Sequence, residues 1–198
     1  SCAITNTAVA SSWSVHKSSD PASGSTVKPG DTIHYSVSLT HLGGVVPAQT
    51  TITDDLSDVL DNAAWGDVQV TSGDAQLSGT TLTWTTGEVA DTAVMTYDVV
   101  VSADAYNQVL RNVVTPPRGG ECDQSCVTEN PTPHFVVEKT SDPVSGSYVN
   151  QGDTITYTLT ATNDSLGLVS GAWVTDDLSS VMDNATLGAP LARSEEHT

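Results

Sequence analysis

The stretch WSVHKSSDPASGSTVKPGDTIHYSVSLT, residues 13–40, contains the pattern on which the fold of the chain depends. Residues 13–18 and 32–40 are rich in Val, Thr, Ser and aromatic side chains, and Gly, Pro, Asp and Ser separate the two segments. Runs of this kind, bounded by turn-forming residues, are typical of β-strands. Between them KPGD predicts a turn, because Pro29 presets φ and Gly30 supplies positive φ.

The same strand signal recurs at short intervals toward the C-terminus. Further strands are predicted at residues 50–54, 67–71, 80–86, 93–102 and 109–115. The segment DDLSDVLDN predicts one helical turn capped by an aspartate, and no long helix is expected. About seven short strands within about 100 residues are typical of an all-β, immunoglobulin-like β-sandwich.

The chain also contains an internal repeat. The segment WSVHKSSDPASGS at residues 13–25 returns as FVVEKTSDPVSGS at residues 135–147, an offset of 122. The same offset carries VKPGDTIHYS onto VNQGDTITYT and TDDLSDVLDNA onto TDDLSSVMDNA. Self-similarity at a fixed period indicates repeated structural units. We therefore expect tandem immunoglobulin-like β-sandwich domains, the second of them truncated.

The repeat divides the 198 residues into five parts. Residues 1–12 are interpreted as the tail or linker of a preceding repeat, and 13–116 as one complete sandwich. Residues 117–134 are predicted to be a linker that contains cysteines, and 135–192 a second repeat without its last strands. RSEEHT at residues 193–198 resembles the translation of a sequencing adapter, so we interpret it as a library artefact; an ordinary polar tail is the alternative.

Charge and motifs exclude several classes of function. The net charge is −18 and the pI about 4.1, which argues against nucleic acid and anionic membranes as partners. No apolar run is long enough for membrane insertion. Because GxSxG, P-loop, GxGxxG and HExxH motifs are absent, we expect neither an enzyme nor a cofactor. The acidic segment TDDLSDVLDNA could hold calcium, but its spacing does not match an EF-hand, so a solvated acidic face is favoured.

The chain has three cysteines, Cys2, Cys122 and Cys126, and their pairing indicates whether the protein works in an oxidising compartment. Zinc would require four ligands, and His134 is the only candidate nearby, so no metal site is expected. Cys122 and Cys126 are close in a turn-rich segment, which favours a small disulfide loop over two free thiols. A disulfide implies an oxidising, extracellular setting. The partner of Cys2 is expected to precede residue 1.

Alternation places three polar side chains on inward faces. In the first strand Lys17 shares its face with Trp13 and Val15. By the same rule Asp54 and Asn112 lie among apolar neighbours in their strands. Burying a lysine without a partner is costly, because the charged form loses its hydration or its proton. An inward lysine that recurs in both copies therefore calls for inward partners.

The pattern KxSDPxSG…GDTIxYxxxxT…ITDDL…RNVVT resembles the conserved repeat domains in the stalks of Gram-positive bacterial surface proteins. The inward amine, acid and carboxamide resemble those of Cna-type intramolecular isopeptide domains in adhesins and pilins. The resemblance implies that neutral Lys17 attacks the side chain of Asn112, with protonated Asp54 as the proton shuttle. In the second copy it carries over to Lys139 and Asp176.

The resemblance implies a structural stalk or spacer repeat of a secreted or cell-wall-anchored protein. Its expected partners are neighbouring repeats of the same chain. Two alternatives stay open. The inward residues could form a buried ion pair with Asn112 as a hydrogen-bonding neighbour. The module could instead bind a carbohydrate or a host protein, and Trp65 or Trp84 could stack on sugars, although sandwich cores also use Trp.

Overall fold

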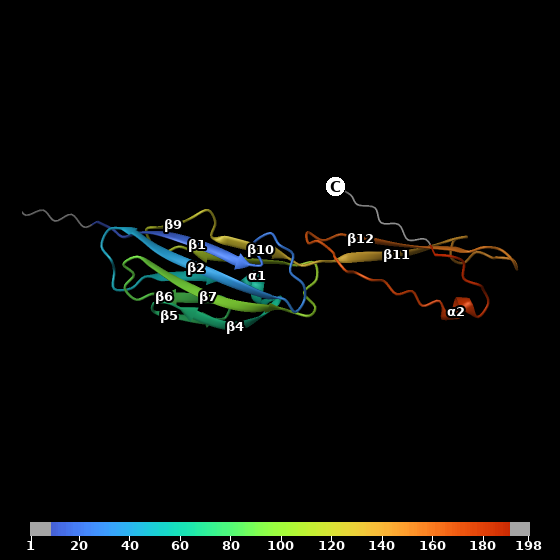
Figure 1. The fold of residues 1–198 in the computed structure, drawn as a ribbon, viewed down its shortest axis with the longest axis horizontal. Coiled ribbons are helices and arrows are strands. Elements are labelled where there is room, and N and C mark those ends of the chain that lie inside the picture. Colours follow the sequence, from blue (N-terminus) through green and yellow to red (C-terminus); the bar gives the residue numbers. More distant parts are fainter. Residues whose placement is uncertain (1–8, 191–198) are drawn as a thin grey trace, which may run out of the picture.

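A computed structural model describes residues 9–190 of the chain, and the structural statements below concern these residues (Figure 1). Cys2, most of the N-terminal segment and the suspected artefact at residues 193–198 lie outside the described residues.

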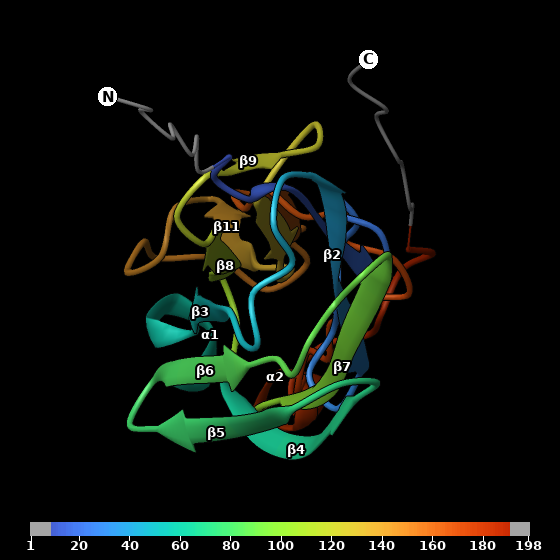
Figure 2. The same cartoon turned by 90° about the vertical axis from the view of Figure 1, so that its left-hand side faces the viewer.

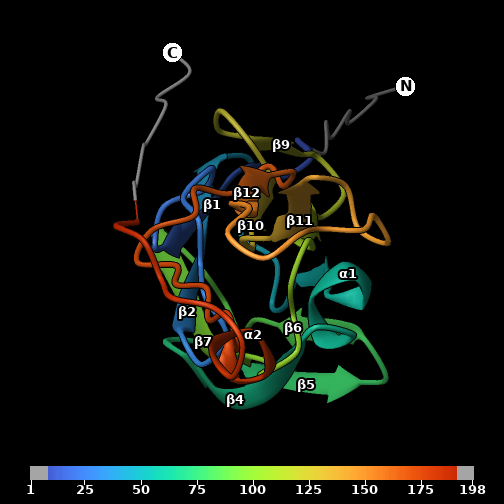
Figure 3. The same cartoon turned by 90° about the vertical axis from the view of Figure 1, so that its right-hand side faces the viewer.

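The first repeat folds as an immunoglobulin-like β-sandwich of two five-stranded sheets. One sheet has the order β4–β7–β2–β1–β9 and the other the order β10–β8–β3–β6–β5. Figures 2 and 3, which look along the long axis from opposite ends, show the two layers facing each other. The strands are β1 (Ser12–Asp20), β2 (Thr32–Gly43), β3 (Thr51–Asp55), β4 (Ala63–Val70), β5 (Asp74–Ser78), β6 (Thr81–Thr85), β7 (Thr92–Val101), β8 (Val109–Thr115), β9 (Gly120–Cys122) and β10 (Val127–Pro131).

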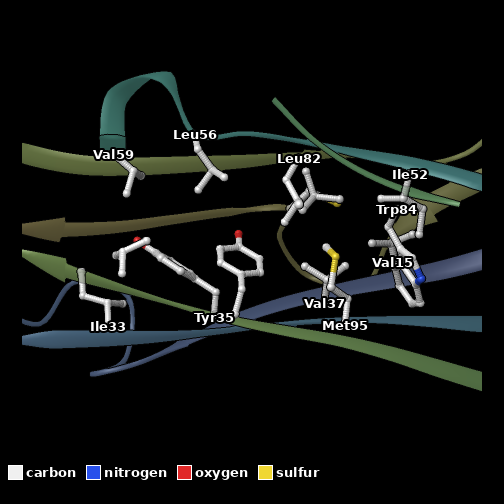
Figure 4. Close-up of a cluster of buried hydrophobic side chains, with 14 of the residues drawn as sticks. Val15, Ile33, Tyr35, Val37, Ile52, Leu56, Val59, Leu82, Trp84 and Met95 are labelled. Carbon is white, nitrogen blue, oxygen red and sulfur yellow. The ribbon is translucent and has the colours of Figure 1, made fainter. Parts of the chain in front are cut away.

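Strict alternation of buried and exposed residues builds the core between these sheets. Along β1 the side chains of Trp13, Val15 and Lys17 are buried, while those between them face outward. The long strands β2 and β7 pair in antiparallel register, with Tyr35 opposite Tyr97. Figure 4 shows the labelled side chains of the two layers meeting in one apolar cluster: Val15, Ile33, Tyr35, Val37, Ile52, Leu56, Val59, Leu82, Trp84 and Met95.

A single helical turn, α1 (Ser57–Leu60), follows β3, but an aspartate does not cap it as predicted. Its N-cap is Leu56, and no side chain makes a capping hydrogen bond. Asp55 instead accepts a hydrogen bond from the Ser57 amide at 3.0 Å. Leu56 and Val59 are buried, so apolar packing anchors this turn against the sandwich.

Two strands lie in the segment that the Gly- and Pro-rich composition assigns to a linker, residues 117–134. Strand β9 pairs in parallel with β1, and β10 pairs antiparallel with β8. Both strands extend sheet edges through backbone hydrogen bonds, which require no apolar side chains. Strand β5, also absent from the predicted set, is likewise an edge strand. The first sandwich therefore continues to Pro131, well past residue 116.

The second repeat forms a two-stranded sheet of β11 (Phe135–Asp142) and β12 (Thr156–Asn163), followed by a helical turn, α2 (Ser179–Met182). Its register repeats that of the first copy, since Lys139 lies opposite Leu159 as Lys17 lies opposite Val37. Within the described residues no second sheet covers it. As a result Leu159 keeps 44% of its surface exposed, whereas its counterpart in the first copy belongs to the closed core.

The two copies lie end to end along the long axis (Figure 1). Only residues 132–134 separate β10 from β11. Two hydrogen bonds cross the junction: Thr26 Oγ1 accepts from the Leu168 amide at 2.8 Å, and Lys28 Nζ donates to Ser170 Oγ at 3.2 Å. Neither helix of residues 9–190 has the length or apolar character needed to span a bilayer.

Candidate functional site

Lys17 projects from the middle of β1 into the core. Alternation directs its side chain inward, and no part of that side chain is exposed. Its Nζ donates a hydrogen bond to Asp54 Oδ2 at 2.7 Å. Asp54 belongs to β3 in the opposite sheet, and its side chain is also fully buried. The ion pair therefore crosses the core from one sheet to the other.

The hydroxyl of Tyr97, on β7, lies at the centre of the cluster. It donates a short hydrogen bond to Asp54 Oδ2 and accepts one from Lys17 Nζ at 3.0 Å. It also accepts a hydrogen bond from Asn112 Nδ2 at 2.7 Å. One phenol oxygen thus touches the amine, the acid and the carboxamide, and all four side chains are buried.

Asn112 lies on β8, beside the strand that carries Asp54. Because its nitrogen and Lys17 Nζ both contact the Tyr97 oxygen, the two nitrogens are no farther apart than the sum of those two distances. Asn112 Oδ1 and Asp54 Oδ1 are both buried acceptors without a hydrogen-bond donor among the described residues. Buried unpaired acceptors are costly, because they lose their hydrogen bonds to water and gain none in return.

Aromatic rings form one wall of the site. Lys17 Nζ lies 5.1 Å from the centroid of the Tyr35 ring and 5.5 Å from that of the Tyr97 ring. The two ring centroids are themselves 5.1 Å apart. A cation this close to aromatic faces gains electrostatic stabilisation. The Tyr35 hydroxyl, unlike that of Tyr97, has no hydrogen-bond partner within residues 9–190.

Burial controls the protonation of this cluster. Desolvation lowers the pKa of Lys17 to about 8, although the adjacent Asp54 carboxylate opposes this shift. About a tenth of the amine is therefore neutral and nucleophilic at pH 7. Desolvation, and next the charge of Asp54, raise the pKa of Tyr97 well above its usual value. Desolvation also raises the pKa of Tyr35. Both phenols therefore keep their protons.

The second copy repeats the pair without the rest of the cluster. Lys139 Nζ lies 2.6 Å from Asp176 Oδ1 and 4.9 Å from the centroid of the Tyr157 ring. The two charged side chains remain 39% and 21% exposed. Within the described residues this copy has no carboxamide at the position equivalent to Asn112. It therefore presents an amine and an acid in water-accessible surroundings.

The two cysteines of the predicted disulfide, Cys122 and Cys126, are joined in the structure, with their Cα atoms 5.5 Å apart. Cys122 ends β9, next to β1, and Cys126 immediately precedes β10, next to β8. The disulfide therefore joins the edges of the two sheets, next to the strands that carry Lys17 and Asn112.

The structure brings together Lys17, Asp54 and Asn112, the three residues that alternation placed on inward faces. Sequence reasoning missed Tyr35 and Tyr97. A signal for Tyr35 was present, because the motif GDTIxY recurs in the second copy with Tyr157. For Tyr97 the only signal was its inward position in a predicted strand.

The other sequence candidates lie elsewhere. Trp84 is a core residue, fully buried, and its indole nitrogen donates to the Ser72 carbonyl at 2.9 Å. Trp65 is partly buried against the core and stacks on Tyr97, with ring centroids 5.4 Å apart. Among the described residues no group of three His, Cys, Asp or Glu side chains is arranged to hold a metal ion.

Comparison with known proteins finds one family. The family described as "Domain of unknown function (DUF7927)" matches residues 12–136 and again residues 134–198. The first match includes β9 and β10, in agreement with their pairing in the first sandwich. No curated protein matches the sequence.

Several solved structures resemble the chain at low identity. The seventh ScaB type I cohesin from Pseudobacteroides cellulosolvens is 4% identical, with a TM-score of 0.42 over 61% of this chain and 86% of that one. The C-terminal domain of the AgI/II polypeptide BspA from Streptococcus agalactiae is 16% identical, with a TM-score of 0.41 over 73% and 60% of the two chains. The full-length major pilin SpaD from Corynebacterium diphtheriae is 13% identical, with a TM-score of 0.40 over 65% and 37%.

Proposed function

The chain belongs to the family described as "Domain of unknown function (DUF7927)", and we propose that its tandem copies are spacer modules of the stalk of a bacterial surface protein. The module is extracellular, either secreted or anchored to the cell wall. Its first copy is stabilised by an intramolecular isopeptide bond between Lys17 and Asn112. The neighbouring repeats are its partners along the chain.

One observation carries the proposal: the amine of Lys17 and the carboxamide of Asn112 meet at one buried hydroxyl, beside a buried acid. In the proposed reaction neutral Nζ attacks the Asn112 side-chain carbon, and the new C–N bond replaces the bond to Nδ2. Ammonia leaves after taking one proton that Nζ gives up. Asp54 takes that proton from Nζ, passes it on and ends the reaction as it began, so the step needs no cofactor.

The end-to-end arrangement of the copies supports a spacer role. The connection between β10 and β11 is three residues long; Pro131 ends β10 immediately before it, and Pro133 is its middle residue. Proline-containing linkers favour extended, semi-rigid chain. The hydrogen bonds of Thr26 and Lys28 across the junction further limit bending. A row of such modules forms a rod and not a flexible string.

The decisive experiment is the intact mass of the full-length chain, followed by peptide mapping. We expect the purified protein to be lighter than its sequence by one ammonia, with a branched peptide joining Lys17 to Asn112. Lys17→Ala, Asp54→Ala and Asn112→Ala should each restore the full mass. Lys28→Ala, at an exposed lysine, is the matched control and should still lose ammonia. A wild-type chain of full mass would leave the buried ion pair as the role of the cluster.

A groove at the junction favours a second candidate, a carbohydrate- or protein-binding module. Its volume is about 460 Å³, and its lining includes Tyr106, Phe135 and Trp173. Tyr106 and Trp173 are 51% and 81% exposed. Exposed aromatic rings suit stacking on sugars. Quenching of tryptophan fluorescence by a bound glycan, lost in Trp173→Ala, would favour this candidate over a spacer.

A further inference from the structure

A continuous path of hydrogen bonds connects the two nitrogens of the proposed reaction, Lys17 Nζ and Asn112 Nδ2. Lys17 Nζ contacts Asp54 Oδ2 at 2.7 Å, and the same Oδ2 accepts from the Tyr97 hydroxyl. The Tyr97 oxygen in turn lies 2.7 Å from Asn112 Nδ2, the nitrogen that must leave as ammonia. No direct hydrogen bond joins Asp54 to Asn112 within the described residues.

We propose that Tyr97 is a catalytic residue of the cross-linking reaction and delivers the proton to the leaving nitrogen of Asn112. This inference rests on the proposed isopeptide bond and assigns the last step of its proton transfer. Asp54 receives the proton from Nζ, and Tyr97 hands a proton to Nδ2. Asp54 makes no hydrogen bond to the leaving nitrogen, whereas the Tyr97 hydroxyl contacts both Asp54 Oδ2 and Asn112 Nδ2.

The proton count balances along this path. Neutral Nζ attacks the side-chain carbon of Asn112, and the carbonyl π pair moves to Oδ1. The resulting cationic Nζ gives one proton to Asp54 Oδ2. As the bond from carbon to Nδ2 breaks, the Tyr97 O–H proton passes to Nδ2, and Tyr97 recovers a proton from Asp54. Amide and ammonia form, the C=O bond is restored, and both acids are regenerated.

The hydrogen bond between Tyr97 and Asn112 must reverse during this reaction. In the resting protein the planar amide nitrogen donates to the phenol oxygen. After attack the carbon becomes tetrahedral, and the nitrogen regains a lone pair that can accept. Burial and the charge of Asp54 raise the pKa of Tyr97, so its proton is present when that lone pair appears. The oxygen need not move, because it already lies at hydrogen-bonding distance.

The chain supplies a matched control for Tyr97. Tyr35 is a second buried tyrosine beside Lys17, at a similar distance from Nζ, but its hydroxyl has no hydrogen-bond partner among the described residues. Replacing either tyrosine with phenylalanine removes one phenol oxygen from the same core. Only the change at Tyr97 interrupts the path from Nζ to Nδ2.

The test uses the full-length chain, isolated unfolded in urea and allowed to react by dilution into buffer. Mass spectrometry at intervals gives the rate of ammonia loss, and circular dichroism reports folding. We expect Tyr97→Phe to slow ammonia loss by roughly 100-fold or more, within the range of general acid–base catalysis. Tyr35→Phe should react at close to the wild-type rate. Equal rates for Tyr97→Phe and wild type would overturn the role of Tyr97 and leave the cross-link intact.

Two further outcomes are decisive. If Tyr35→Phe is slowed as much as Tyr97→Phe, the effect comes from loss of a core phenol and the relay is wrong. If the wild-type chain itself keeps its full mass, both the cross-link and the relay fail. Should Tyr97→Phe not fold, ring-fluorinated tyrosine at position 97 replaces it. A more acidic phenol there should change the rate of ammonia loss, and an unchanged rate would overturn the relay; the same substitution at position 35 should have no effect.

Discussion

Lys17 Nζ lies 2.7 Å from Asp54 Oδ2, although the two residues belong to opposite sheets of the sandwich. Both side chains are fully buried, so water cannot hydrate either charge when its partner is removed. Breaking such a pair costs about 3–5 kcal/mol, because it leaves an uncompensated charge in the core. The stability of the first module therefore depends on whether an ion pair or a covalent cross-link of Lys17 joins the two sheets.

Two substitutions separate the cross-link from the ion pair. Asn112→Ala removes the cross-link but keeps Lys17 beside Asp54, and we expect it to lower the free energy of unfolding by roughly 4–5 kcal/mol, the chain-entropy value for a closed loop of this length. Lys17→Ala also leaves Asp54 buried and unpaired, so its loss should be larger. Urea unfolding of both variants checks the order, and a more stable Lys17→Ala would contradict it.

The uncross-linked protein should become more stable as the pH rises above about 8. Burial lowers the pKa of Lys17 from 10.5 to about 8, so in this window the unfolded chain binds more protons than the folded chain. Stability then rises with pH until about 10, where unfolded tyrosines ionise while folded Tyr97 keeps its proton. Urea unfolding of Asn112→Ala across pH 7–11 checks this, and the double variant with Lys17→Met should lack the rise.

The same pKa sets the rate of cross-linking. Only the neutral amine attacks, so ammonia loss after dilution from urea should accelerate about tenfold per pH unit below pH 8 and level off above it. The time course of intact mass at several pH values measures this. A rate that falls as the pH rises from 6 to 8 would show that the neutral amine is not the nucleophile.

Under force the cross-link should keep most of the module folded. The 94 residues between Lys17 and Asn112 lie inside the closed loop, so they cannot extend when the ends are pulled. We expect the wild-type module to release about 30 nm less contour length than Asn112→Ala in single-molecule stretching, at 3.3–3.6 Å per residue. Equal contour lengths for the two proteins would argue against a covalent bond.

Residues 134–198 should not fold on their own. The sheet of β11 and β12 has only one layer among the described residues, and it leaves the apolar side chains of Tyr157 and Leu159 about two-fifths exposed. Two-stranded sheets are marginal in water without a packed face. Circular dichroism of this fragment should show no cooperative thermal transition, whereas residues 12–136 should show one.

The disulfide should be complete in the oxidised protein and should stabilise the sheet edges. Cys122 and Cys126 are expected to resist thiol labelling in denaturant and to label fully after reduction. Because the bridge closes a very short loop, replacing both residues with serine should cost only about 2 kcal/mol. Mass spectrometry of the labelled peptides decides the first point, and stoichiometric labelling without reductant would contradict it.

The interior strands of the sandwich could be read from the sequence, as could part of the edge strand β4, but the other three edge strands could not. Strand β8 has the predicted bounds, and β2 and β7 begin within one residue of theirs, because long β-branched runs with strict alternation leave one face for the core. Strands β5, β9 and β10 are short and polar. Their pairing uses backbone groups that every residue carries, so their side chains give little sign of it.

Alternation by itself determined that Lys17, Asp54 and Asn112 face inward, because successive side chains of a strand point to opposite faces. The repeat offset determined that the lysine and the acid recur together in the second copy. Only the tertiary structure decided which inward residues meet. Contact across the gap between two sheets depends on how the sheets lie over each other, and alternation carries no information about that. The packing of β7 opposite β3 and β8 places the Tyr97 hydroxyl between amine and carboxamide.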